Sequence, residues 1–173
     1  MAQFSVATFR TVGAAALTQN LFSIWNGSDK VVRIQQLIMQ MDATVVLTAV
    51  MPLIKTSRVS VAPDAGVTLT KVAYDAGNPV SESLLIVKGE CSVDGGTRTA
   101  LTGTPDAVLW QQYGFRLHTA VGQVLGTDNK LLPSPIVLRR DQGLIVHIVA
   151  AATTSNPATN SYFVQCLWEE SSS

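Results

Sequence analysis

Short runs of alternating or β-branched residues, separated by clusters of turn-forming residues, recur along the whole chain. Alternation places successive side chains on opposite faces of an extended strand, and β-branched residues favour a pleated sheet over a helix. The pattern predicts about ten strands, at residues 4–12, 21–25, 31–41, 44–54, 67–73, 83–87, 108–119, 136–138, 144–152 and 162–168. We therefore expect an all-β protein.

Many short strands with irregular connections and little helix are typical of a protein built from two packed sheets. We expect an antiparallel β-sandwich, with a jelly roll as the preferred arrangement. No segment is long or biased enough to be a domain linker, so residues 1–173 are expected to form a single domain with a short polar tail at 171–173. Asn26 and Gly27 lie between two predicted strands. Because Asn-Gly tolerates the positive φ angles of a tight turn, a hairpin is expected there.

The chain carries few charges for its size. Of its 173 residues 14% are charged, and 12 basic residues balance 12 acidic ones, whereas about 25% is typical. A surface with few, balanced charges is poorly protected against self-association. We expect copies of the chain or a partner to cover much of it, and a modestly soluble monomer is the alternative. The only basic doublet is Arg139-Arg140, so nucleic acid is not an expected partner.

The first residues lack the positive charge and the apolar run of a secretory signal peptide. The most apolar stretch, residues 37–54, contains Gln40 and Asp42, so it is not expected to span a membrane.

Cys91 and Cys166 are the two cysteines. They have no framework spacing, and two free thiols in a reducing compartment are favoured over one disulfide.

Three predicted strands, at residues 44–51, 144–152 and 162–168, are apolar on both faces. An ordinary sandwich strand is apolar only on the side that faces the core. A strand with two apolar faces needs a second cover, which can be a loop of the same chain or a neighbouring subunit. Together with the low charge content, the recurrence of the pattern favours a subunit interface. A closed homotrimer in which one sheet of each chain faces the axis fits this pattern.

The sequence contains no motif of a catalytic or metal site. His118 and His147 are not paired at the spacing of a zinc site, and interface or pocket-lining positions are expected for them. No nucleophile motif, phosphate loop or dinucleotide fingerprint is present. We therefore expect no enzymatic activity, no metal and no cofactor. Glu169 and Glu170 are expected to be a solvated strand end.

Three tryptophans raise the possibility of a sugar-stacking platform. Trp25, Trp110 and Trp168 each lie in an apolar strand context, which favours packing in a core or an interface. A carbohydrate-binding, lectin-like sandwich is therefore the alternative function, and a cupin-type enzyme is a more distant one.

Two segments resemble a known group of proteins. Residues 21–34, LFSIWNGSDKVVRI, resemble the opening of small structural proteins of tailed bacteriophages. Residues 132–144, LPSPIVLRRDQGL, resemble the run that precedes a late strand in those proteins, although Arg140 and Asp141 stand where the pattern more often has Pro-Gly.

The resemblance implies a virion protein made in the host cytoplasm: a jelly-roll decoration (cement) protein that trimerises on the capsid surface and contacts the major capsid protein. A tail or baseplate component is the alternative within the structural class. Residues 56–66 and 90–106 are expected to be loops for capsid contact or outward display. The expected trimer contacts are Val45, Leu47, Ile145, His147 and Val149. Val149→Glu is expected to cost several kcal/mol and to leave a monomer, because a buried unpaired charge is heavily penalised.

Overall fold

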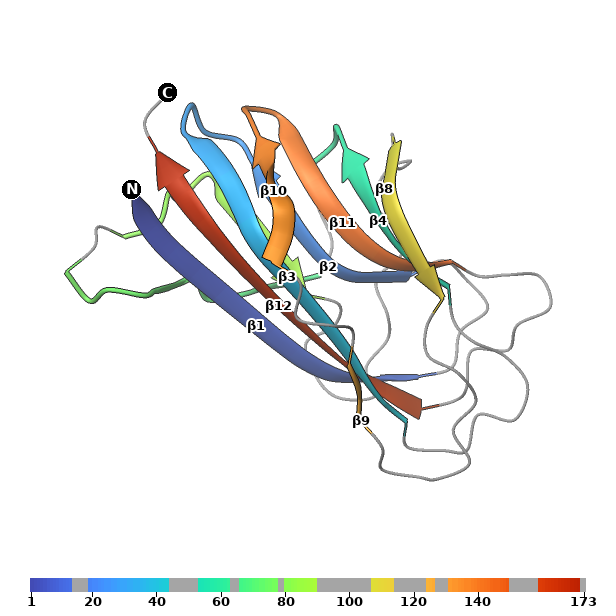
Figure 1. Cartoon of the computed structure of the whole chain (residues 1–173). Coiled ribbons are helices and arrows are strands. Elements are labelled where there is room, and N and C mark those ends of the chain that lie inside the picture. The colour runs from blue at the N-terminus through green and yellow to red at the C-terminus, as the bar shows by residue number, and fades with distance from the viewer. Residues whose placement is uncertain are drawn as a thin grey trace.

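The computed structural model describes residues 1–13, 19–43, 53–62, 66–77, 80–89, 107–113, 124–126, 131–149 and 159–171. Within these ranges the chain forms twelve β-strands and no helix (Figure 1). The strands are β1 (Ala2–Gly13), β2 (Gln19–Asn26), β3 (Val31–Ala43), β4 (Leu53–Val59), β5 (Val67–Thr68), β6 (Val72–Ala73), β7 (Leu85–Gly89), β8 (Ala107–Tyr113), β9 (Val124–Gly126), β10 (Leu131–Leu138), β11 (Gln142–Val149) and β12 (Thr159–Ser171).

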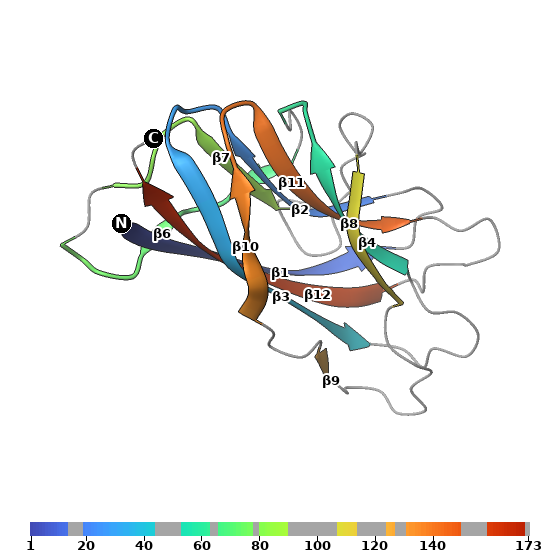
Figure 2. The same ribbon diagram turned by 45° about the horizontal axis from the view of Figure 1, so that its top comes forward.

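The strands form two antiparallel sheets that face each other (Figures 1 and 2). Sheet A has the order β10-β3-β12-β1-β6, and β9 pairs with β3. Sheet B has the order β5-β7-β2-β11-β4-β8. The expected all-β antiparallel sandwich is confirmed, and the jelly-roll arrangement stays a prediction.

Most predicted strands correspond to strands of the structure. Those at 4–12, 21–25, 31–41, 83–87, 108–119, 136–138, 144–152 and 162–168 correspond to β1, β2, β3, β7, β8, β10, β11 and β12, with shifted ends. Residues 114–119 and 150–152 lie outside the described residues. The alternation rule works for strands such as β1 and β7, whose described side chains alternate between a buried inner face and a less buried outer face.

Other predictions were wrong in part. Residues 67–73 were expected to be one strand but form β5 and β6, which belong to different sheets. Of the strand expected at 44–54, only the last two residues lie in β4, and residues 44–52 are outside the described residues. Thr56 to Val59 lie in β4 and not in the expected loop. The polar run Lys55-Thr56-Ser57 hides the extended pattern of this strand in the sequence. The short strand β9 was not predicted.

The expected hairpin at Asn26-Gly27 is also wrong, because the turn crosses from one sheet to the other. β2 pairs with β7 and β11 in sheet B, while β3 pairs with β10 and β12 in sheet A. The Asn26 side chain explains this path. Its Nδ2 donates hydrogen bonds to the carbonyls of Lys30, at 2.7 Å, and Leu138, at 3.2 Å. A side chain that bonds its own turn and the neighbouring connection replaces the backbone pairing of a hairpin.

The main core lies between the sheets. Its buried apolar residues come from both sheets, and the largest fully buried side chains are Trp168, Phe4, Phe22, Leu21, Ile24, Ile34, Leu85, Leu138 and Leu144. Phe4 and Trp168 stack with ring centroids 6.0 Å apart. Burial of such side chains is the main source of stability in a folded domain.

A bulge in β3 explains one irregular sequence pattern. Ile34 and Leu37 are three residues apart, yet both are buried in the core. The register with β12 shifts between Leu167 and Trp168, which leaves Gln35 as an extra residue in β3. A bulge reverses the phase of the alternation, so both apolar side chains can face inward.

Candidate functional site

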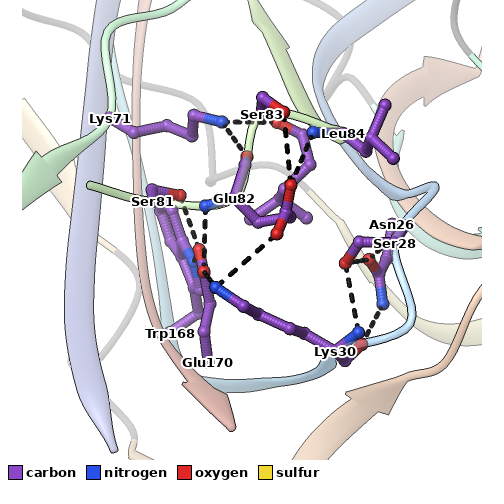
Figure 3. Close-up of polar contacts among 11 residues, drawn as sticks. Asn26, Ser28, Lys30, Lys71, Ser81, Glu82, Ser83, Leu84, Trp168 and Glu170 are labelled. Atoms are coloured by element: carbon purple, nitrogen blue, oxygen red, sulfur yellow. Dashed lines mark hydrogen bonds and ion pairs between the residues drawn. The ribbon is translucent and has the colours of Figure 1, made fainter. Parts of the chain in front are cut away.

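A polar cluster closes the end of the sandwich where β12 stops, and its centre is the carboxylate of Glu170 (Figure 3). Glu170 is only 5% exposed. Its Oε1 accepts hydrogen bonds from Ser81 Oγ at 2.5 Å and from Trp168 Nε1 at 3.1 Å. Its Oε2 accepts one from the backbone N–H of Glu82 at 3.0 Å. The prediction of a solvated strand end is therefore wrong for Glu170.

Two lysines bind the segment between β6 and β7 to this cluster. Lys30 Nζ lies 3.7 Å from Glu170 Oε2 and 3.6 Å from Glu82 Oε2. Lys71 Nζ donates to the carbonyls of Glu82, at 2.5 Å, and Leu85, at 2.8 Å. Burial lowers the pKa of Lys71, and the negative charges of Glu170 and Glu82 act in the opposite direction. The two lysines thus balance the buried carboxylate and satisfy backbone carbonyls of the turn.

Glu82 is held by its own turn. The backbone N–H of Leu84 is the largest cause that lowers the pKa of Glu82, and hydrogen bonds from Ser83 and the charge of Lys30 act in the same direction. Leu85 N–H donates to the Glu82 carbonyl at 3.1 Å, and Gly27 N–H donates to the Leu84 carbonyl at 3.0 Å. The turn at 82–85 is therefore fastened both to β12 and to the turn after β2.

The connections β2–β3 and β10–β11 lie next to each other and support this end of the sandwich. Asn26 Oδ1 accepts hydrogen bonds from Ser28 N–H at 3.1 Å and Ser28 Oγ at 2.8 Å. The Asn26 carbonyl accepts one from Asp141 N–H at 2.7 Å. Asp141 has a φ of 59°, which Asp tolerates better than most residues. Residues 21–34 and 132–144 therefore meet at these connections.

The chemistry of this cluster is structural. Each Glu170 oxygen is occupied by protein donors, and both lysines contact carboxylates or carbonyls of the same chain. A catalytic carboxylate or lysine needs a face that a substrate can reach. The arrangement instead fixes the end of β12 against the turn that precedes β7.

Sequence reasoning missed Glu170, although a signal was present. Glu170 shares its strand parity with Val164, Cys166 and Trp168, which are all buried. Alternation alone therefore places it on the inner face. The contributions of Lys30, Lys71 and Ser81 come from distant segments, and no local pattern connects them to β12.

The expected trimer contacts are only partly within the described residues. Val45 and Leu47 lie outside them, and Val149 is the last residue of β11. Ile145 and His147 are each 3% exposed in the single chain. Their role in a trimer stays a prediction.

Ile145 belongs to a small apolar cluster on the outer face of sheet B. It packs with Trp25 and Val59, and Ala62 and Ile86 lie against them. A Cβ at Gly143 would come within 2.9 Å of the Trp25 ring and 2.8 Å of the Ile24 carbonyl. The indole therefore lies directly over the backbone of β11, which needs glycine at this point.

The outer face of sheet A carries apolar side chains that the single chain leaves half-buried. On β12 these are Phe163 and Leu167, with Gln165 between them. Ile38 of β3 is opposite Gln165 in the register. The intervening residues of β12 face the core. Of the two-faced strands predicted from the sequence, β12 thus has an outer face that remains partly accessible.

Trp25 and Trp168 do not form a shared platform. Trp168 lies in the core between the sheets and Trp25 in the cluster on the outer face of sheet B. Trp110 lies in β8.

Of the two cysteines, Cys166 is a free thiol in the core, and burial raises its pKa. Cys91 lies outside the described residues.

Within the described residues there is no helix long and apolar enough to cross a membrane. In the same part of the chain, no three His, Cys, Asp or Glu side chains gather in a group that could hold a metal ion. His118 lies outside the described residues.

Comparison with protein-family models, curated proteins and solved structures finds no match.

Proposed function

We propose that the chain is a non-enzymatic structural protein of a bacteriophage virion, which forms a homotrimer and decorates the capsid surface. Its partners in this role are two further copies of itself and the major capsid protein. The resemblance of residues 21–34 and 132–144 to small structural proteins of tailed phages supports the proposal. The charge content of 14% supports it too, since a surface covered by neighbours needs few charges.

The observation that carries the proposal is the outer face of β12. Phe163 and Leu167 lie on a sheet face where an isolated sandwich ordinarily presents polar side chains. Apolar side chains on such a face gain free energy when another protein surface covers them. A chain with this face is suited to permanent contact with other subunits.

The polar cluster around Glu170 fits the same role. A decoration protein has to keep its shape while it is bound to a large shell, and buried polar networks that are fully satisfied make a fold rigid. Here the network ties β12 to the turn before β7 through Ser81 and Glu82. The charged groups of this network thus contact other groups of the same chain.

Two measurements test the proposal. Light scattering coupled to size-exclusion chromatography should give a mass near three times 18.4 kDa. Gold-labelled antibodies against the chain should bind the heads of particles purified from cultures in which the encoding genome replicates. Labelling on tails would make the chain a tail or baseplate component, and particles without label would exclude a virion protein.

A further inference from the structure

We infer that sheet A, and not sheet B, is the sheet that faces the trimer axis, so that the outer face of β1, β12 and β3 binds a second copy of this chain. This inference rests on the trimer of the proposed function and names its contact surface. We define the axial face by the outward residues of three cross-strand rows of sheet A. Starting at the end of the strands where Glu170 lies, these rows are Gln3–Glu169–Arg33, Ser5–Leu167–Gln36 and Ala7–Gln165–Ile38.

Among the described residues, the outer faces of the two sheets differ in how much the chain itself covers them. At the centre of sheet B, Trp25, Ile145 and Val59 are between 3% and 6% exposed, and they leave little area for a partner. At the centre of sheet A, Leu167, Gln165 and Ile38 are half-buried. In Figure 1 no described element lies over the broad face of β1, β12 and β3. The uncovered face is the one that association can still bury.

The charge of the axial face suits a second copy. Its charged side chains among the described residues are Glu169 and Arg33, which are register partners in the outermost row. Gln3 Nε2 donates to Glu169 Oε1 at 2.9 Å, and Arg33 Nη1 donates to Ser171 Oγ at 3.2 Å. The next two rows carry no charge. Two copies of this face bring no net like charge together, whereas a face of one sign would repel itself.

The face is large enough to contribute substantially to a contact between subunits. Strands of 12 to 13 residues are roughly 40 Å long, and three of them are roughly 15 Å wide, so the flat area is on the order of 600 Å². β10 on one side and Val72 of β6, which is 56% exposed, on the other side add to it. About 800 Å² per partner is typical of one stable interface. The face and its flanks approach that area for one contact, and in a trimer they are shared between two neighbours.

The composition of the face fits a contact within a virion. Leu167 and Ile38 supply apolar area, and Phe163 extends it in the adjoining row, while Gln36 and Gln165 supply uncharged donors and acceptors. Interfaces between subunits are depleted in charged residues at their centre and retain some polar groups that bond across the contact. A nucleic acid or an acidic partner would instead need a basic face.

The test places a carboxylate at the centre of the axial face. Gln165→Glu changes the shape of the side chain little, and in a separated chain the new charge remains in contact with water. In the trimer it would be buried without a counter-ion, so we expect the dissociation constant of the trimer to rise ~100-fold or more. Leu167→Glu is a second variant with the same expected result. Val80→Glu is the matched control, because Val80 is 90% exposed and lies outside sheet A.

Masses are measured by light scattering over a dilution series, with circular dichroism to show that each variant is folded. A trimeric wild type and Val80→Glu variant, with folded monomers of Gln165→Glu and Leu167→Glu, support the inference. Trimers in all four proteins overturn the inference and leave the proposed function standing. A monomeric wild type overturns both. Wild-type trimers that depend on sheet A but are absent from purified particles overturn the proposed function alone.

Discussion

β11 and β12 have the same sequence character but different surroundings. Both strands are apolar at odd and even positions. β11 is the third strand from one edge of sheet B, and the described residues on both of its faces, Leu144 to His147, are buried within the single chain. β12 lies at the centre of sheet A, and its outer residues Phe163 and Leu167 remain half-buried. An apolar second face therefore has two different meanings, which only the cover on that face distinguishes.

The difference teaches that intrachain cover and intersubunit cover leave the same sequence signature. Either kind of cover favours apolar residues on both faces of a strand. The sequence pattern indicates only that a face is shielded from water, and not what shields it. The trimer contacts expected at Ile145 and His147 lie on β11, and the chain itself already covers these residues. The face of β12 is the one with area still to be buried.

The largest expected effect comes from a charge on the outer face of β11. Ile145→Glu buries an unpaired carboxylate against Trp25 and Val59, and should lower the free energy of unfolding by about 3–5 kcal/mol. Leu167→Glu on β12 should change the same quantity by less than about 1 kcal/mol in the separated chain. Urea denaturation at low protein concentration measures both without the contribution of association. Equal losses in the two variants would abolish the distinction between the strands.

The inner side of β12 should be as sensitive as β11. Glu170→Ala leaves Ser81 Oγ, Trp168 Nε1 and the Glu82 N–H without their acceptor, and we expect a loss of about 2–4 kcal/mol. Glu170→Gln keeps an oxygen acceptor and should lose less, about 1–2 kcal/mol. Thermal or urea unfolding checks both values. A neutral Glu170→Ala variant would mean that the cluster does not stabilise the fold.

A smaller effect is expected from added volume at Gly143 in β11. The new methyl group would meet the Ile24 carbonyl at 2.8 Å and the Trp25 ring at 2.9 Å. Gly143→Ala should therefore destabilise the chain by about 1–3 kcal/mol. Ala76→Val, at an exposed position outside both sheets, is the control and should stay within about 0.5 kcal/mol. If the two variants unfold at the same urea concentration, the outer face of β11 is less tightly covered than described.

The polar end of β12 also predicts an acid dependence that the apolar cover of β11 does not provide. The pKa of Glu82 in the folded chain lies below its ordinary value of 4.5, chiefly because the Leu84 N–H bonds its carboxylate. Its contribution to stability is therefore present above pH 4.5 and is lost as the pH falls through the lower, folded pKa. Melting temperatures measured across this range should fall less steeply for Glu82→Gln than for the wild type. Parallel curves would contradict a role for Glu82 in acid sensitivity.

Much of the fold could be predicted from the sequence, because the alternation of residues within a strand indicates which of its side chains are buried. The alternation of Phe4, Val6 and Thr8 is enough to place β1. No local pattern within a strand indicates which of the two sheets it joins. The Asn26-Gly27 turn therefore has the sequence of a hairpin, although it crosses between the sheets and Asn26 bonds Leu138 and Asp141.

The candidate site was less predictable, and the reason is physical. The cluster around Glu170 joins β12 to Lys30 and Ser81, which are far away in the sequence. Hydrogen bonds between distant residues follow from the three-dimensional arrangement and have no period in the chain. Parity could have shown that Glu170 faces inward, but not which donors would meet it.

The position of β12 also constrains how the chain can fold over time. β12 lies between β1 and β3 and pairs with both along nearly its whole length. During synthesis β1 and β3 emerge long before the strand that must separate them. Contacts between residues so distant in the chain slow folding, and unpaired strand edges are open to wrong partners in the meantime. Sheet A can therefore be completed only after β12 has been made, and its outer face forms only then.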